Sequence, residues 1–186
     1  MNAMDVRNYL EDGERLLWEG KPKPFHIIEG SEGRELMFVW AVSLFWLYMI
    51  LMVRLYNGMN TVLLAFLIAV LAWISLSPVA AYFRILRQHY CLTNRRALVV
   101  NVNGERSSME LKAIENYRIF KTESEGASLA MGDELLAENG KQLRYRALHP
   151  MRNLDSDGKL VTSGIVFYHA ERVDVAARIL EKMSRK

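Results

Sequence analysis

Two long uncharged runs constrain the fold of this 186-residue chain more than any other feature. Residues 36–53 and residues 61–83 contain no charged side chain. About 20 apolar residues cross the ~30 Å hydrocarbon core of a bilayer as a helix. The first run reaches that length by continuing to Tyr56, with Arg54 extending to the interface. Neither run has the polar stripe usual in helices of soluble proteins. The sequence therefore predicts transmembrane helices over about 36–56 and 61–83.

The segment between the two runs, residues 54–60 (RLYNGMN), fixes their arrangement. Seven residues with an Asn-Gly turn signal can join only neighbouring antiparallel helices, so both chain ends lie on one side of the bilayer. Basic residues cluster outside this connection, at Arg34 before the first helix and at several arginines after the second. The positive-inside rule therefore predicts that both termini are cytoplasmic.

Charge divides the chain into three parts. Residues 1–35 form an acidic N-terminal cytoplasmic segment, residues 36–83 form the transmembrane helical hairpin with Arg54 as its one charge, and residues 84–186 form a basic cytoplasmic domain. Pro78 lies near the end of the second run, after Ser75 and Ser77. A bilayer helix tolerates such a proline where neighbours or hydroxyls satisfy the freed carbonyl.

The pattern from residue 84 onward is that of a β-rich domain. Apolar alternation predicts strands over residues 87–93, 97–102, 105–111, 114–121, 141–148 and 163–169, with a further small-residue run over 126–132. Asn103-Gly104 predicts a tight hairpin turn. The last segment, 171–186, has an apolar stripe at helical spacing, made by Val173, Ala176, Ala177, Leu180 and Met183. These elements predict an antiparallel sheet or partial barrel closed by a helix.

Two short motifs flank the hairpin. The first follows GE-x-x-x-W-x-G-x-P, and the second begins as Y-x-L-T-x-x-R; their residues are Gly13, Glu14, Trp18, Gly20, Pro22, Tyr90, Leu92, Thr93, Arg95 and Arg96. In this order the chain resembles the bacterial membrane-flanked pleckstrin-homology-like (PH-like) family. The resemblance implies a membrane α+β protein of the bacterial cytoplasmic (inner) membrane. In such a protein a cytoplasmic PH-like antiparallel β-barrel with a C-terminal capping helix follows the hairpin.

Motifs of catalysis and cofactor binding are missing from the sequence. It contains no dinucleotide fingerprint, phosphate-binding loop or serine elbow, and its four histidines are scattered. Cys91, the single cysteine, lies two residues from His89, yet such a thiol is more often a packing residue than a nucleophile. We therefore predict no catalytic, metal or cofactor-binding residues and a non-enzymatic protein. Nucleic-acid binding is not expected, because the 18 basic residues of 84–186 are offset by 13 acidic ones.

The candidate contact residues are basic or aromatic. Four arginines come at the expected membrane-proximal start of the domain: Arg84, Arg87, Arg95 and Arg96. A basic side chain near an anionic leaflet gains about 1 kcal/mol. The cluster therefore fits topogenic charge and surface docking, a headgroup or phosphate pocket at Arg95 and Arg96, or an acidic protein surface. Trp18 is either a packing or lipid-interface residue or a partner contact.

These features lead to three functional hypotheses. The first is a membrane-anchored PH-like adaptor that docks on the cytoplasmic leaflet and binds a protein partner or assembles as a homo-oligomer. The second is a sensor of anionic lipid or phosphate headgroups through Arg95 and Arg96. The third is a membrane enzyme acting on a lipid-like substrate.

Overall fold

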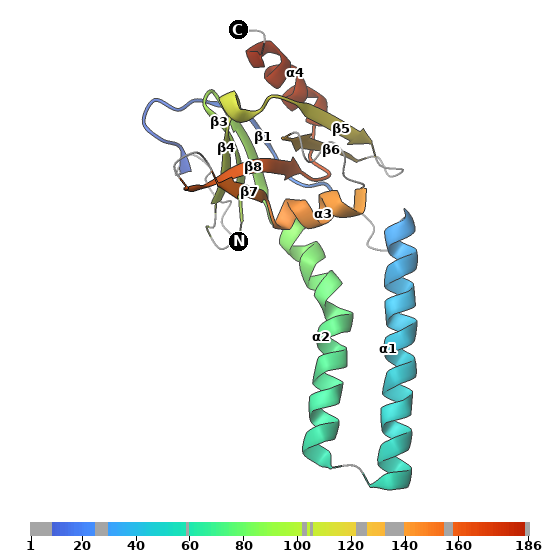
Figure 1. The fold of residues 1–186 in the computed structure, drawn as a ribbon. Coiled ribbons are helices and arrows are strands. Elements are labelled where there is room, and N and C mark those ends of the chain that lie inside the picture. The colour runs from blue at the N-terminus through green and yellow to red at the C-terminus, as the bar shows by residue number, and fades with distance from the viewer. Residues whose placement is uncertain are drawn as a thin grey trace. The chain divides into compact units, whose positions relative to one another are not determined.

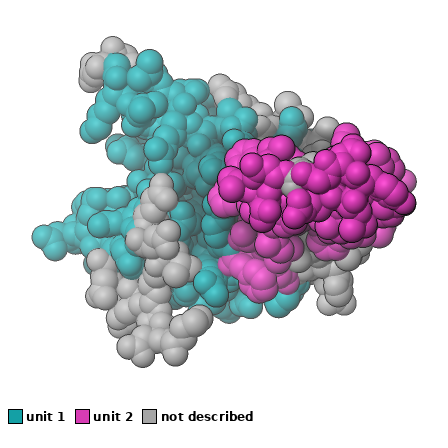
Figure 2. Space-filling view, turned by 90° about the horizontal axis from the view of Figure 1, so that it is seen from below, with its two compact units in different colours: residues 1–25, 84–186 teal, residues 26–83 magenta. Residues whose placement is uncertain are grey.

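The computed structural model divides the chain into two compact units. Unit 1 contains residues 1–25 and 84–186, and unit 2 contains residues 26–83, as Figure 2 shows in two colours. The structure describes residues 9–24, 30–58, 60–101, 104, 106–121, 126–132, 140–154 and 158–184, with only the backbone at 30–33, 35, 140, 141 and 184.

Unit 2 is a helical hairpin. Helix α1 (Gly30–Asn57) and most of helix α2 (Thr61–Leu86) form it, and both are long and apolar enough to cross a membrane. Their apolar side chains are largely exposed, unlike those of the core helices of a soluble protein. Gly58 follows α1 with a φ of +66°, and the Asn60 side chain caps α2 by accepting from Val62 N at 2.8 Å. Two candidate membrane-spanning helices are thus present where the sequence predicts them.

Pro78 lies inside α2, and a side-chain hydroxyl bonds to the backbone carbonyl that this proline leaves without a donor. Proline has no N–H, so it leaves the carbonyl of Ile74 without its usual helical donor. The Ser77 hydroxyl donates to that carbonyl at 3.2 Å. Trp40 on α1 donates through Nε1 to the neighbouring carbonyl of Ser75 at 3.1 Å, which also links the two helices. A hydroxyl thus satisfies the carbonyl freed by Pro78, which is one of the ways in which a bilayer helix tolerates a proline.

Unit 1 contains two antiparallel four-stranded sheets (Figure 1). The first has the order β1-β2-β3-β4, with β1 (Leu16–Gly20), β2 (His89–Thr93), β3 (Arg96–Val100) and β4 (Arg106–Glu110). The second has the order β5-β6-β8-β7, with β5 (Tyr117–Lys121), β6 (Ala127–Met131), β7 (Met151–Leu154) and β8 (Leu160–Phe167). A 3-10 turn, η2 (Leu111–Ala113), connects the sheets. Gly104 has the predicted turn conformation, with a φ of +75°, whereas Asn103 lies outside the described residues.

Strand β1 comes from the N-terminal segment that precedes the hairpin. It pairs with β2 in the register Leu16↔Thr93, Trp18↔Leu92 and Gly20↔Tyr90. The charge pattern predicts a separate segment over residues 1–35, but residues 9–24 fold with the strands that follow the hairpin. The first sheet is therefore built from both sides of the hairpin.

One hydrophobic core lies between the two sheets and helix α4 (Val173–Ser184). Side chains from β2, β3, β4, β6 and β8 meet the predicted apolar stripe of α4, whose Val173, Ala176, Ala177 and Leu180 are all buried. The C-terminal helix is confirmed. The predicted barrel is not closed among the described residues, because η2 and residues 114–116 separate β4 from β5, which pairs only with β6.

The predicted strand over 141–148 is wrong, since these residues form helix α3 (Gly140–Leu148). Leu143 and Ala147, one helical turn apart, are buried, while Tyr145 between them is 59% exposed. Period-two alternation and helical i, i+4 spacing coincide over so short a run, and packing on β8 selects the helix. Strand β7 follows α3 in a stretch too polar to predict as a strand.

Candidate functional site

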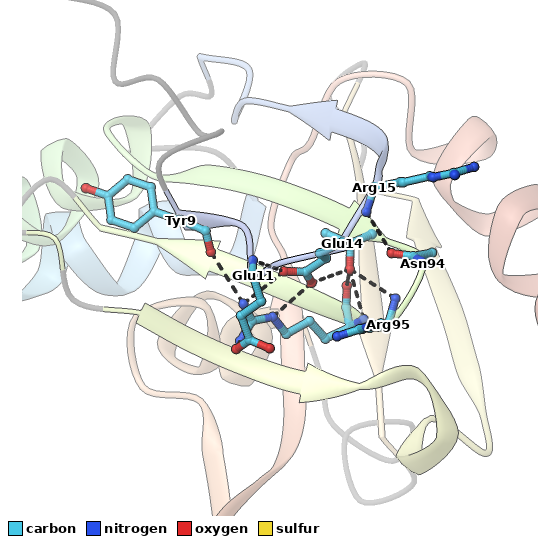
Figure 3. A network of polar contacts seen from close by, with 8 residues as sticks. Tyr9, Glu11, Glu14, Arg15, Asn94 and Arg95 are labelled. Atoms are coloured by element: carbon cyan, nitrogen blue, oxygen red, sulfur yellow. Dashed lines mark hydrogen bonds and ion pairs between the residues drawn. The ribbon is translucent and has the colours of Figure 1, made fainter.

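The two sequence motifs meet in a buried ion-pair network (Figure 3). The Glu14 side chain is fully buried, and the Arg96 side chain is 15% exposed. Arg96 donates through Nε to Glu14 Oε1 and through Nη2 to Glu14 Oε2, both at 3.0 Å. This two-point geometry is the strongest form of an arginine–carboxylate contact. Glu11 Oε1 lies 2.8 Å from Nη1 of the same guanidinium.

Other donors complete the environment of Glu14. The Thr93 hydroxyl donates to Glu14 Oε1 at 2.7 Å, and the backbone N–H of Glu11 donates to Oε2 at 2.8 Å. Burial by itself would raise the pKa of Glu14, but these hydrogen bonds and the Arg96 charge hold it below its ordinary value. Burial would likewise lower the pKa of Arg96, and Glu14 and Glu11 raise it instead. Both groups therefore remain charged at neutral pH.

Backbone contacts fix the β2–β3 turn against the N-terminal segment. Arg15 N donates to Asn94 Oδ1 at 2.8 Å, and Asn94 N donates to the carbonyl of Arg15 at 3.0 Å. Gly13, with a φ of +76°, lets the chain turn beside Arg95, whose Nη2 would lie 3.5 Å from a Cβ at this position. Figure 3 shows Glu11 and Glu14 of this segment facing the turn that carries Asn94 and Arg95.

The rest of the first motif packs into the core. Trp18 stacks on Phe167 with ring centroids 5.5 Å apart, and Phe167 stacks in turn on Tyr90 at 5.0 Å. A Cβ at Gly20 would overlap the Trp18 ring, so this strand position requires glycine. Pro22 then forms an isolated bridge with Ala170. Trp18 is 6% exposed, so of the two interpretations of this residue the structure favours packing on the domain.

The four candidate arginines do not form one cluster. Arg84 and Arg87 precede β2 and are exposed, whereas Arg95 and Arg96 follow it. Five strand residues rise roughly 17 Å, so the two pairs lie at opposite ends of this strand. Only Arg84 and Arg87 are therefore next to the end of the apolar run at Phe83. Arg95 is exposed, and Arg96 is held by Glu14.

A groove of about 930 Å³ lies beside the network. It is bordered by the β2–β3 turn, by the connection from β4 to β5 and by the C-terminal end of α4. Its apolar lining is buried or half-buried: Leu111, Ile114, Tyr117, Leu180 and Met183. Its exposed charged lining carries both signs: Glu11, Arg95, Glu110, Lys112 and Glu115. This surface suits a ligand with apolar groups and charges of both signs.

The partners of Arg96 and the groove were not predicted from the sequence. The one available signal is that the first motif has an acidic residue, Glu14, among its defining positions, whereas the second has Arg95 and Arg96. The groove had no signal, because its lining comes from four separate stretches of sequence.

Metal-ligating and nucleophilic groups are dispersed in the described part of the chain. Within it, no group of three or more His, Cys, Asp or Glu side chains could hold a metal ion. His169 is buried and His149 lies against Tyr145. His26 lies outside the described residues.

Cys91 is expected to resist alkylation in the folded protein. It is fully buried, and burial, with smaller contributions from Glu19 and Glu14, raises the pKa of its thiol to about 12. The reactive thiolate is then about a thousandfold rarer than for an ordinary cysteine. Labelling with a maleimide at pH 8 should be at least a hundredfold slower in the native protein than in denaturant. Equal rates would contradict the burial of this residue.

Comparisons with protein-family models, with curated proteins and with solved structures found no match to this chain.

Proposed function

We propose that this chain is a non-enzymatic adaptor of the bacterial cytoplasmic membrane. In this proposal the hairpin spans the bilayer, and unit 1 is a cytoplasmic PH-like domain. Its groove binds an extended segment of a protein partner. The observation that carries the proposal is the groove, with its apolar lining and its exposed charges of both signs.

The hairpin topology supports the membrane part of the proposal. Strand β1 precedes α1 and pairs with β2, which follows α2. If both helices cross the bilayer, the segments before and after them must lie on the same side to share one sheet. The excess of arginines beyond the helix ends, compared with Arg54 alone in the connection, favours the cytoplasm as that side.

The chemistry of the groove supports a peptide more than a phosphate group. Glu110 and Glu115 would repel a phosphate, and the Arg96 guanidinium is already shared by Glu14 and Glu11. A peptide can place apolar side chains on Ile114 and Leu180 while matching charges at the edge. Strand β5, which contributes Tyr117, is an edge of its sheet, and edge strands accept an added strand through backbone hydrogen bonds.

Site-specific cross-linking tests the proposal. A photo-reactive amino acid replaces Glu115, an exposed groove residue, in the full chain in its native membrane. We expect one dominant cross-linked protein, whose attached segment is then identified by mass spectrometry. The same group at exposed Asp174, in the first turn of α4 and away from the groove lining, is the matched control.

The identified segment is then titrated as a synthetic peptide against the full chain in nanodiscs. Lys112→Glu reverses one groove charge and Met183→Asp places a charge on the apolar lining, and each should weaken binding about tenfold, a change of about 1.4 kcal/mol. Equal yield and pattern of cross-linking from positions 115 and 174 would refute the groove as the binding site. A peptide affinity that neither Lys112→Glu nor Met183→Asp changes would refute it as well.

A further inference from the structure

Helix α3 has a basic sequence that contains no acidic residue. Its sequence, GKQLRYRAL, contains Lys141, Arg144 and Arg146. One face is buried on β8 through Leu143 and Ala147. Tyr145 projects from a different face and is 59% exposed, with the Arg146 guanidinium 5.9 Å from its ring centroid. An exposed aromatic among cations is typical of a surface that contacts lipid headgroups.

Gln88 fixes α3 to the end of α2. This residue comes two positions after α2, is 1% exposed, and donates through Nε2 to the carbonyl of Ala147 at 2.9 Å. Its Oε1 accepts from the Tyr90 hydroxyl at 3.0 Å, and its N–H donates to the carbonyl of Ile85 at 2.9 Å. The last turn of α2 and the last turn of α3 are therefore held together within unit 1.

The covalent chain keeps this junction close to the proposed membrane surface. The apolar run of α2 ends at Phe83, and Gln88 follows five residues later. Three helical residues and two extended ones reach at most about 12 Å. If α2 spans the bilayer, as the proposed function requires, the end of α3 that contacts Gln88 lies within this reach of the headgroup layer. Arg84 and Arg87, both exposed, lie in the same stretch.

We propose that α3, together with Arg84 and Arg87, is a docking face for the anionic lipids of the cytoplasmic leaflet. The exposed Arg84 and Arg87 and the half-buried Arg146 complement the negative leaflet, and each contributes about a fivefold gain in docking. Tyr145 enters the headgroup layer. The docking face lies at the start of β2, whereas Arg95 and Arg96 follow the end of this strand. Leaflet contact is therefore made by residues other than Arg95 and Arg96, the pair that the sequence predicts to bind a headgroup. It leaves the groove open to a partner.

The test uses the full chain in nanodiscs, with Tyr145→Cys labelled by an environment-sensitive dye. Cys91 is buried and does not compete for the label. We expect dye emission to shift to the blue and at least double in discs containing about a quarter phosphatidylglycerol, compared with pure phosphatidylcholine. About 0.5 M salt, which shortens the screening length to roughly 4 Å, should reverse the change. A label at Lys112→Cys, in η2 at the groove, should be insensitive to lipid charge.

Charge variants in the labelled protein separate docking from structure. The triple change R84Q, R87Q and R146Q should abolish the response to phosphatidylglycerol, whereas R84K, R87K and R146K should retain it. Unreactive Cys91 in each variant reports that unit 1 is still folded. Equal emission at position 145 in both lipids, or a response that survives the glutamine changes, would overturn leaflet docking. A chain that does not incorporate into nanodiscs through its hairpin would instead overturn the proposed function.

Discussion

Replacing Glu14 with alanine is expected to lower the free energy of unfolding of unit 1 by about 3–5 kcal/mol, the usual cost of removing one partner of a buried ion pair. The Glu14 side chain is fully buried and accepts hydrogen bonds from Arg96, Thr93 and the backbone of Glu11. Its loss leaves the Arg96 guanidinium, 15% exposed, without its main counter-charge. Chemical unfolding of the full chain in nanodiscs, followed by near-UV circular dichroism, measures the change.

Glu11→Ala is the matched control for this substitution. Glu11 contacts the same guanidinium at 2.8 Å, but its side chain is 62% exposed. Water screens such a pair, so its removal should cost about 1 kcal/mol or less. If the two substitutions destabilise unit 1 equally, burial does not set the strength of the network.

The pH dependence of unfolding of wild type and of Glu14→Gln gives a second measurement. The pKa of Glu14 is lowered in the folded protein. Burial alone would raise it, but the hydrogen bonds from Arg96, Glu11 N and Thr93, together with the charge of Arg96, outweigh the effect of burial. A carboxyl with a lowered folded pKa stabilises the protein above its unfolded pKa, and this contribution is lost as pH falls through the folded value. The difference between wild type and Glu14→Gln should therefore be constant near neutral pH and shrink below about pH 4.3.

The elements that depend on local pattern were predictable from sequence. Two uncharged runs gave the apolar helices, and alternation around the Asn-Gly turn gave β2, β3 and β4. The apolar stripe gave α4. Each of these signals lies within one short stretch, where side-chain spacing alone decides which face is apolar.

The pairing of β1 with β2 was not predictable in this way. The LLWEG strand is short and flanked by charges, and its partner follows the whole hairpin. For the same reason, Arg96 resembled a free cation in the sequence. Its carboxylate partner Glu14 is 82 residues away, and only the fold shows that the two side chains meet.

The fragment 84–186, expressed without the N-terminal segment, is expected to be largely unfolded or aggregated. It lacks β1, so β2 becomes an unpaired apolar edge, and it lacks Trp18, which stacks on Phe167. Truncating a buried tryptophan alone costs about 3–5 kcal/mol, and loss of Glu14 adds a similar amount. These losses together approach the 5–15 kcal/mol that stabilises a typical domain, each value being approximate. Dispersion of amide proton shifts and near-UV circular dichroism measure the outcome.

A fusion that replaces the hairpin with a flexible linker should restore the fold. Residues 1–24 joined to 84–186 through about 12 glycine and serine residues, with a mean reach of roughly 19 Å, supply β1, Glu14 and Trp18 to the same sheet. The same fusion carrying Trp18→Ala and Glu14→Ala keeps the chain length but removes the main contacts, so it should behave like the fragment. A folded fragment 84–186 with a protected Cys91 would contradict the prediction. In that case β1 would be an addition to an independent domain rather than one of its strands.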